Sequence, residues 1–190
     1  MSAAIDAQQF DEAFAAATLL AAALERSQTK IVFAESCTAG LVSAVLAHVP
    51  GVSTWHCGSA VTYREATKVG WLGVSAEDLA RFTAVSEPVA RQMAIGVLRN
   101  TPEAQLALSI TGHFGPNAPS EFDGVAFVGV ARRLATNESS NANDTDDEAS
   151  DCQVLACHRL QLKATERIAR GWEAATDVIR LATELIANWD

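Results

Sequence analysis

The chain has little basic charge, and this shortage narrows the range of partners. It holds 14 lysines and arginines against 23 aspartates and glutamates in 190 residues, a formal net charge of −9. Binding of nucleic acid through its phosphates needs a basic surface, so we expect no nucleic-acid partner. Long apolar runs are absent too. The alanine-rich segment 13–24 is too short and too weakly apolar to cross a bilayer, so we expect no membrane partner.

Cysteine is also sparse, and none of the four cysteines is spaced C-x-x-C: they are Cys37, Cys57, Cys152 and Cys157. A metal site made of Cys152, Cys157 and His158 would lack a second ligand pair at zinc-finger spacing, so we expect no metal. We interpret the cysteines instead as small, buried thiols. With no disulfide framework and no basic, apolar leader, we expect a reducing, cytoplasmic location.

One stretch, residues 136–151, is polar, acidic and of low complexity. Six of the chain's negative charges lie there with no lysine or arginine, which leaves a net charge of −3 for the rest. Such a composition cannot bury enough apolar surface to fold. Because it separates two predicted strands, it indicates a flexible acidic loop within a hairpin rather than a linker. The 190 residues are therefore expected to form a single domain with a substantial core.

Apolar periodicity and turn residues divide the chain into alternating helices and strands. Strands are predicted at 29–34, 55–63, 105–111, 125–133 and 152–162, and helices at 5–27, 41–49, 64–70, from 75 onward, 86–100 and 164–189. Helices alternate with strands in the first half, and a hairpin closes the sheet later. The sequence therefore predicts an α/β fold, a layered α/β/α sandwich with a mixed central sheet of about five strands.

The run Ala34–Gly40, Ala-Glu-Ser-Cys-Thr-Ala-Gly, lies between the first predicted strand and the following helix. Such a turn exposes backbone N–H groups and the positive end of the helix dipole. It can hold an anion, or it can present Ser36 as a nucleophile beside oxyanion donors. Glu35 is either a buried carboxylate that accepts backbone N–H bonds and fixes the turn, or an ordinary exposed one.

Tyr63 is the single tyrosine, and Lys68 is one of three lysines. They lie five residues apart where a strand gives way to a helix. A serine nucleophile without a histidine needs another base, and a lysine can serve when burial lowers its pKa. The tyrosine would then relay or orient the proton. The alternative is a solvated lysine and a tyrosine packed at a strand end.

The loop 112–124 and the last predicted helix hold further candidates. Gly112 follows a central strand, where a glycine lets the backbone approach a ligand closely. His113 is either a catalytic base or a solvated loop side chain. Arg167 and Arg170 open the last helix, where cations oppose the dipole unless an anion lies nearby. They therefore either contact phosphate or carboxylate, or lie on a solvated face.

Taken together, these motifs resemble the CinA C-terminal domain family, the nicotinamide-nucleotide amidases. The family motif A-E-S-C-T-G-G corresponds to residues 34–40, and V-T-Y-x-x-x-x-K corresponds to 61–68. Four further motifs occur in order, V-P-G-x-S, L-G-V, A-V-S-E-P-V-A and A-L-S-x-T-G-x-x-G-P, at 49–53, 72–74, 84–90 and 107–116. The resemblance thus covers most of the chain.

The resemblance implies deamidation of nicotinamide mononucleotide to nicotinate mononucleotide and ammonia, with no cofactor or metal and a small-molecule pyridine nucleotide as partner. It implies Ser36 as nucleophile, Lys68 as general base and Tyr63 as an aid to proton transfer. Backbone N–H groups around residues 36–38 would stabilise the oxyanion, and water would hydrolyse an acyl-enzyme. The residues implied to bind substrate are Cys37, Thr38, Thr111, Gly112 and Arg167.

The chain departs from the family pattern in three places. Between the tyrosine and the lysine, Arg-Glu-Ala-Thr at 64–67 replaces the usual S-N-E-A. Ala39 replaces the first of the two glycines of C-T-G-G. The family's T-G-I-A-G-P and the later K-P-V-G become Thr-Gly-His-Phe-Gly-Pro at 111–116 and Glu-Phe-Asp-Gly at 121–124. Because a lysine near the pocket is lost, two alternatives stay open: a non-catalytic nucleotide-binding module, or an amidase on a different carboxamide whose acidic loop selects a cationic substrate. The oligomeric state is open as well, a homo-oligomer included.

Overall fold

A mixed five-stranded sheet forms the centre of the part of the chain that the computed structural model describes, residues 7–134 and 152–188. The predicted acidic loop 136–151 lies outside the described residues. The strand order is β2-β1-β3-β4-β5. β2, β1 and β3 run parallel, and β4 and β5 join antiparallel. The strands are β1 (Ile31–Glu35), β2 (His56–Val61), β3 (Leu106–Gly112), β4 (Val125–Arg133) and β5 (Cys152–Gln161).

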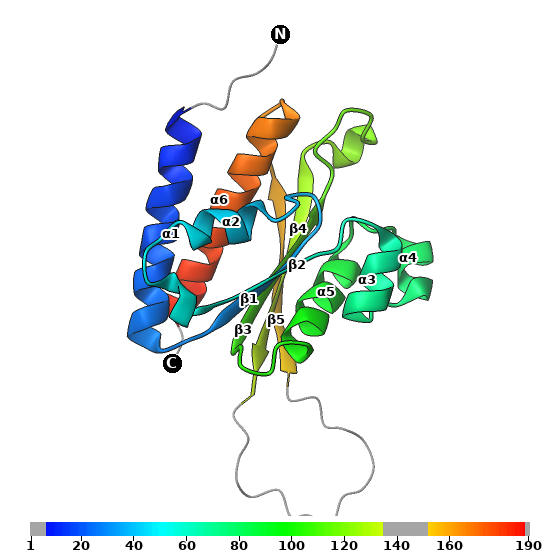
Figure 1. The fold of residues 1–190 in the computed structure, drawn as a ribbon. Coiled ribbons are helices and arrows are strands. Elements are labelled where there is room, and N and C mark those ends of the chain that lie inside the picture. The colour runs from blue at the N-terminus through cyan, green and yellow to red at the C-terminus, as the bar shows by residue number, and fades with distance from the viewer. Residues whose placement is uncertain (1–6, 135–151, 189–190) are drawn as a thin grey trace, which may run out of the picture.

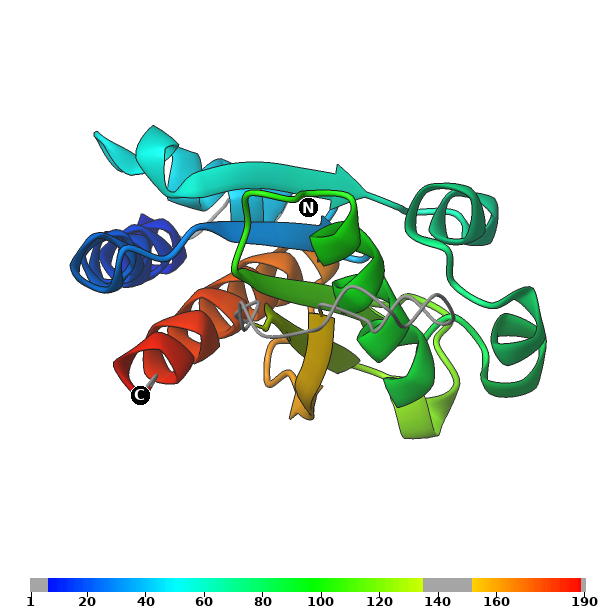
Figure 2. The same cartoon turned by 90° about the horizontal axis from the view of Figure 1, so that it is seen from below.

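Helices cover both faces of the sheet, so the predicted α/β/α sandwich is confirmed (Figure 1; Figure 2). Each helical layer packs against its own hydrophobic core. One layer consists of α1 (Ala7–Ser27), α2 (Leu41–Ala47) and α6 (Arg167–Ala187); the other consists of α3 (Glu65–Leu72), α4 (Ala76–Phe82) and α5 (Glu87–Arg99). None of the helices in the described ranges is both long and apolar enough to cross a membrane.

β1 lies between two other parallel strands, and all five of its residues are buried. Its side chains alternate between the two cores: Phe33 belongs to one, and Val32 and Ala34 to the other. Such burial on both faces explains why the strand is almost continuously apolar. Glu35 ends β1 opposite Ile110 of β3. Residues that follow β1 and β3 therefore meet at one edge of the sheet.

The last helix begins at Arg167, three residues later than predicted, because residues 163–166 make a different set of hydrogen bonds. The Glu173 carboxylate accepts the N–H groups of Lys163 and Ala164 at 2.9–3.1 Å. The Ala164 carbonyl accepts from Arg170 Nε at 2.8 Å. Glu173 and Arg170 of α6 thus anchor the segment that joins β5 to the helix.

Candidate active site

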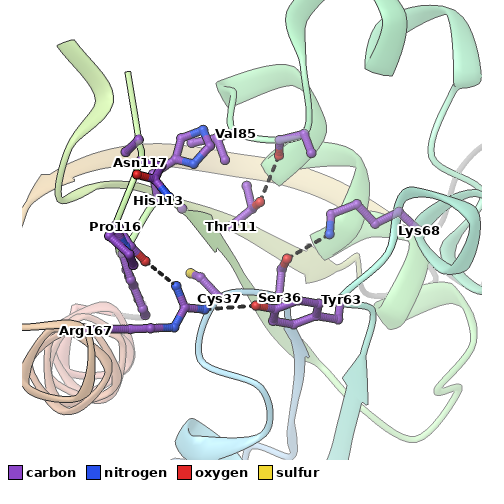
Figure 3. A pocket seen from close by; sticks show the side chains of 15 residues that line it. Ser36, Cys37, Tyr63, Lys68, Val85, Thr111, His113, Pro116, Asn117 and Arg167 are labelled. Carbon is purple, nitrogen blue, oxygen red and sulfur yellow. Dashed lines mark hydrogen bonds between the residues drawn. The ribbon is translucent and has the colours of Figure 1, made fainter. Parts of the chain in front are cut away.

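A pocket of about 300 Å³ opens at the carboxyl ends of β1, β2 and β3 (Figure 3). At this edge, parallel strands bring loops from distant parts of the sequence together. Thr38 is the one predicted site residue that is not part of the pocket wall; its hydroxyl donates to Glu35 Oε2 at 2.8 Å. The predicted residues that line the pocket are Ser36, Cys37, Tyr63, Lys68, Thr111, Gly112 and Arg167.

Lys68 of α3 is buried beside Ser36, with only 1% of its surface exposed. Its Nζ lies 2.8 Å from Ser36 Oγ and donates to the Thr62 carbonyl at 2.6 Å. Burial lowers the pKa of Lys68, and the nearby carboxylate of Glu65 only partly opposes this. A lysine held this way is not the solvated surface side chain of the alternative interpretation. It can lose its proton more readily than a free lysine and can take the serine proton.

The Glu35 carboxylate is fully buried and lies at the centre of the turn, as one of the two interpretations predicted. Five groups donate hydrogen bonds to it at 2.8–3.1 Å. Three of them are backbone N–H groups at the start of α2, which a carboxylate near a helix N-terminus stabilises. The anion at this helix end is therefore the chain's own side chain, not a ligand. The donors are Thr38 Oγ1, Gly40 N, Val42 N, Ser43 N and Ser59 Oγ.

The turn leaves fewer oxyanion donors than the sequence suggested. The Ser36 N–H donates to the Ile110 carbonyl at 3.0 Å, so it continues the hydrogen bonding between β1 and β3. The N–H groups of Cys37 and Thr38 have no oxygen acceptor within the described ranges. Both N–H groups lie against the Cys37 sulfur, which is a weak acceptor, so they are the backbone donors of the turn that stay open to an oxygen ligand.

Cys37 is next to the serine, but its environment keeps the thiol protonated. Burial raises the pKa of Cys37 to about 12, against the opposing effects of backbone N–H groups and Lys68. Because the thiolate is the nucleophilic form, this thiol is unreactive near neutral pH. Ser36, with Lys68 at its oxygen, is the better nucleophile of the pair.

The backbone of the turn needs residues that tolerate a left-handed conformation. Ala39 has φ 53° and Gly40 has φ 97°. A residue with a Cβ atom is strained in this region by about 1–2 kcal/mol. The family's glycine at position 39 would relieve that strain, so Ala39 makes the turn less stable.

Tyr63 and Arg167 form a bridge along one side of the pocket (Figure 3). Arg167 Nη2 donates to the Tyr63 hydroxyl at 2.9 Å, and its Nη1 donates to the Gly115 carbonyl at 2.6 Å. In the described part of the chain, the tyrosine hydroxyl bonds neither to Ser36 nor to Lys68. Its assistance to proton transfer therefore stays a prediction that a bound substrate or water would have to complete.

Thr111 and Gly112 end β3 at the floor of the pocket. The Thr111 hydroxyl donates to the Ala84 carbonyl at 2.8 Å, which joins β3 to the segment before α5. A Cβ at Gly112 would lie 2.7 Å from Ala126 Cβ and 2.8 Å from the Val125 carbonyl. The close approach to β4 thus requires glycine here; Gly112 also lines the pocket, and its approach to a ligand stays a prediction.

Arg170 contacts a carboxylate of this chain rather than a ligand. The side chain is 5% exposed, and its two terminal nitrogens donate to the two Asp123 oxygens at 2.7 and 2.8 Å. The hydrogen bonds from Arg170 lower the pKa of Asp123. Asp123, in the segment that stands where the family pattern has K-P-V-G, thus attaches the β3–β4 loop to α6.

Sequence reasoning missed part of the pocket wall. Ala84, Val85 and Asn117 line the pocket without having been candidates; His113, which was a candidate, lines it too. The first two belong to the motif A-V-S-E-P-V-A, which was a signal that this segment lies near the site. Across residues 7–134 and 152–188, no group of three or more histidine, cysteine and acidic side chains is placed to hold a metal.

Comparison with known proteins agrees with these motifs. The CinA C-terminal domain family matches residues 13–161. A CinA-like protein of Trichormus variabilis is 40% identical over 158 residues, covering 81% of this chain and 38% of that protein. A CinA-like protein of Mycobacterium sp. strain JLS is 47% identical over 136 residues, covering 69% of this chain and 32% of that protein. The chain therefore spans about a third of the length of these relatives.

Solved structures share the fold. A CinA superfamily protein from Klebsiella pneumoniae superposes with a TM-score of 0.78 at 23% identity, covering 93% of this chain and 99% of that one. The competence/damage inducible protein CihA from Agrobacterium tumefaciens gives a TM-score of 0.73 at 26% identity, covering 98% of each chain. With the family match over residues 13–161, these likenesses show that the chain belongs to the CinA C-terminal domain family.

Proposed function

We propose that this chain is an amidohydrolase that converts nicotinamide mononucleotide to nicotinate mononucleotide and ammonia. The observation that carries the proposal is the buried Lys68 Nζ, 2.8 Å from Ser36 Oγ. A serine paired with a desolvated lysine is a nucleophile with its own base, and it needs no histidine or metal. The amide bond and the nucleotide come from the family resemblance, and the site geometry is compatible with both.

In the proposed reaction, neutral Lys68 takes the proton of Ser36 as the serine oxygen attacks the carboxamide carbon. The N–H groups of Cys37 and Thr38 stabilise the resulting oxyanion. Collapse of this intermediate breaks the C–N bond, and the Lys68 ammonium gives its proton to the departing amide nitrogen, which leaves as ammonia. Lys68 then takes a proton from water as the water oxygen attacks the acyl-enzyme carbon. Collapse of the second intermediate breaks the bond to Ser36 Oγ, and the Lys68 ammonium returns the proton to that oxygen, which releases the carboxylic acid and free Ser36. The Thr62 carbonyl holds the lysine amine in place throughout.

The charges around the pocket support a substrate with an anionic part. Arg167 lines it as a permanent cation, and among the described residues no aspartate or glutamate lines it. Asp123 of the acidic loop is engaged with Arg170 instead. This arrangement argues against the alternative in which the acidic loop selects a cationic substrate.

The test is an assay of ammonia release with Ser36→Ala and Lys68→Met. We expect each variant to lose activity by at least about 10³-fold, since removal of one member of a catalytic unit costs nearly as much as removal of all. Ser120→Ala, on an exposed loop position outside this pocket, is the matched control. Thermal unfolding of each variant shows whether the fold is retained.

The same assay separates the remaining alternatives. Full activity of Ser36→Ala would contradict the nucleophile assignment. Tight binding of the nucleotide with no product at high enzyme concentration would favour a non-catalytic binding module. Turnover of other carboxamides, with none of the mononucleotide, would favour an amidase of different specificity.

A further inference from the structure

Two polar side chains in the catalytic pocket have no part in the proposed reaction. His113 and Asn117 lie on the loop that leaves β3, on the side of the pocket away from Lys68 (Figure 3). Neither side chain has a hydrogen bond to another residue in the described ranges. Both are therefore available to a ligand, unlike Arg167, whose terminal nitrogens are bonded to Tyr63 and Gly115.

The backbone around His113 is held in place. The His113 N–H donates to the Val125 carbonyl at 2.9 Å, and the His113 carbonyl accepts from Gly124 at 3.1 Å. These bonds extend the β3–β4 ladder into the loop, and the imidazole ring lies 6.2 Å from the ring of Phe122. A side chain supported this way is presented to the pocket at a small entropic cost on binding.

Asn117 is supported from the other end of the loop. Its φ is 71°, a left-handed conformation that asparagine adopts more readily than most residues. Two residues earlier, the Gly115 carbonyl is held by Arg167 at 2.6 Å. The loop that carries both side chains is thus fastened to β4 and to α6.

Charge and chemistry favour an anionic ligand group here. An imidazole N–H and an amide NH₂ are donors that suit phosphate oxygens. With Lys68 neutral as the base, Arg167 is the cation in the lining, and no carboxylate of the described residues lines the pocket. The family pattern has isoleucine where this chain has His113, and it has a lysine after the loop where this chain has none. Relative to the family pattern, the chain thus gains a polar side chain at position 113 and lacks the lysine after the loop.

We propose that His113 and Asn117 bind the phosphate monoester of the nucleotide substrate. The inference rests on the proposed function, because it assumes that the carboxamide lies at Ser36. In this binding mode the phosphate lies at His113 and Asn117, which line the same pocket as Ser36. These two are specificity-determining residues, while Ser36 and Lys68 do the chemistry.

The experiment compares nicotinamide mononucleotide with its nucleoside, which lacks the phosphate. The variants are His113→Ile and Asn117→Ala, with Ser120→Ala as control. We expect His113→Ile to raise the KM and the Kd for the nucleotide by about tenfold or more, the cost of a hydrogen bond to a charged group. Asn117→Ala should act in the same direction, while kcat for the nucleotide and all values for the nucleoside stay unchanged.

The outcomes separate this inference from the proposed function. An equal change for nucleotide and nucleoside would mean that His113 only supports the loop, and it would overturn the inference. So would a wild-type protein that binds both with the same Kd. If wild type hydrolyses neither compound, the proposed function fails. Kd values measured by calorimetry then test phosphate recognition on its own. A preference for the nucleotide that His113→Ile abolishes would still support phosphate recognition.

Discussion

Replacement of Glu35 by glutamine tests how the turn that carries Ser36 is held. The carboxylate is fully buried and accepts five hydrogen bonds. Oε2 accepts three, from Thr38, Gly40 and Val42, and Oε1 accepts two, from Ser43 and Ser59. The substitution keeps the size of the side chain but turns one acceptor oxygen into a donor.

The magnitude follows from these bonds. When the glutamine oxygen faces the three donors, its NH₂ group faces the Ser43 N–H and the Ser59 hydroxyl. The hydroxyl can rotate to accept, but the backbone N–H cannot, so one buried donor is left unpaired at a cost of about 1–3 kcal/mol. The other bonds lose the strength that a charged acceptor provides, while a neutral amide costs less to bury. We expect a net loss of about 2–4 kcal/mol, a large fraction of a typical folding free energy.

Urea unfolding followed by tryptophan fluorescence measures the loss. Glu103→Gln is the matched control, because Glu103 is an exposed acid whose partner Lys30 also lies at the surface. The control should leave the unfolding midpoint almost unchanged. A loss below about 1 kcal/mol for Glu35→Gln, with normal ammonia release, would refute the argument that Glu35 holds the turn.

Two further predictions concern Lys68 and Ala39. Burial lowers the pKa of Lys68 below its ordinary 10.5, so kcat/KM should rise with pH through this lowered pKa and then level off, as the neutral amine is the base. At pH values between the folded and the unfolded pKa of Lys68, the unfolded chain binds one more proton than the folded chain, so the free energy of unfolding should also rise with pH there. Lys68→Met should abolish that rise when the free energy of unfolding is measured by urea at a series of pH values. A rise that persists in the variant would contradict the lowered pKa of Lys68. Ala39→Gly should stabilise the protein by about 0.5–1 kcal/mol, as relief of left-handed strain exceeds the entropy gained by the unfolded glycine chain. Destabilisation in thermal unfolding would contradict it.

Features that depend on neighbouring residues were predictable. The strand at 125–133 has its predicted bounds, because a run of apolar and β-branched residues ends at charged and turn residues. The helix after Ser75 begins as predicted, and the Ser75 hydroxyl accepts the Asp78 N–H at 3.2 Å. In both cases the structural signal lies within a few residues of the element it defines.

Contacts between segments far apart in the sequence could not be predicted from neighbouring residues. Arg167 and Tyr63 are 104 positions apart, and Arg170 and Asp123 are 47 apart. The sequence indicated that the arginines were candidates for an anion contact, but it contained no signal for their partners. Arg167 joins Tyr63 to Gly115 along the pocket. Arg170 holds the loop that carries Asp123.

The sequence by itself determined the local chemistry: a strand-to-helix turn with Glu35 and Ser36, and a lysine one turn into a later helix. Only the tertiary structure decided that Lys68 is buried against Ser36, that Glu35 and not a ligand occupies the start of α2, and that the Ser36 N–H is used by Ile110. The physical reason is that spacing along the chain sets backbone conformation, whereas burial and hydrogen-bond partners depend on which segments the sheet brings together.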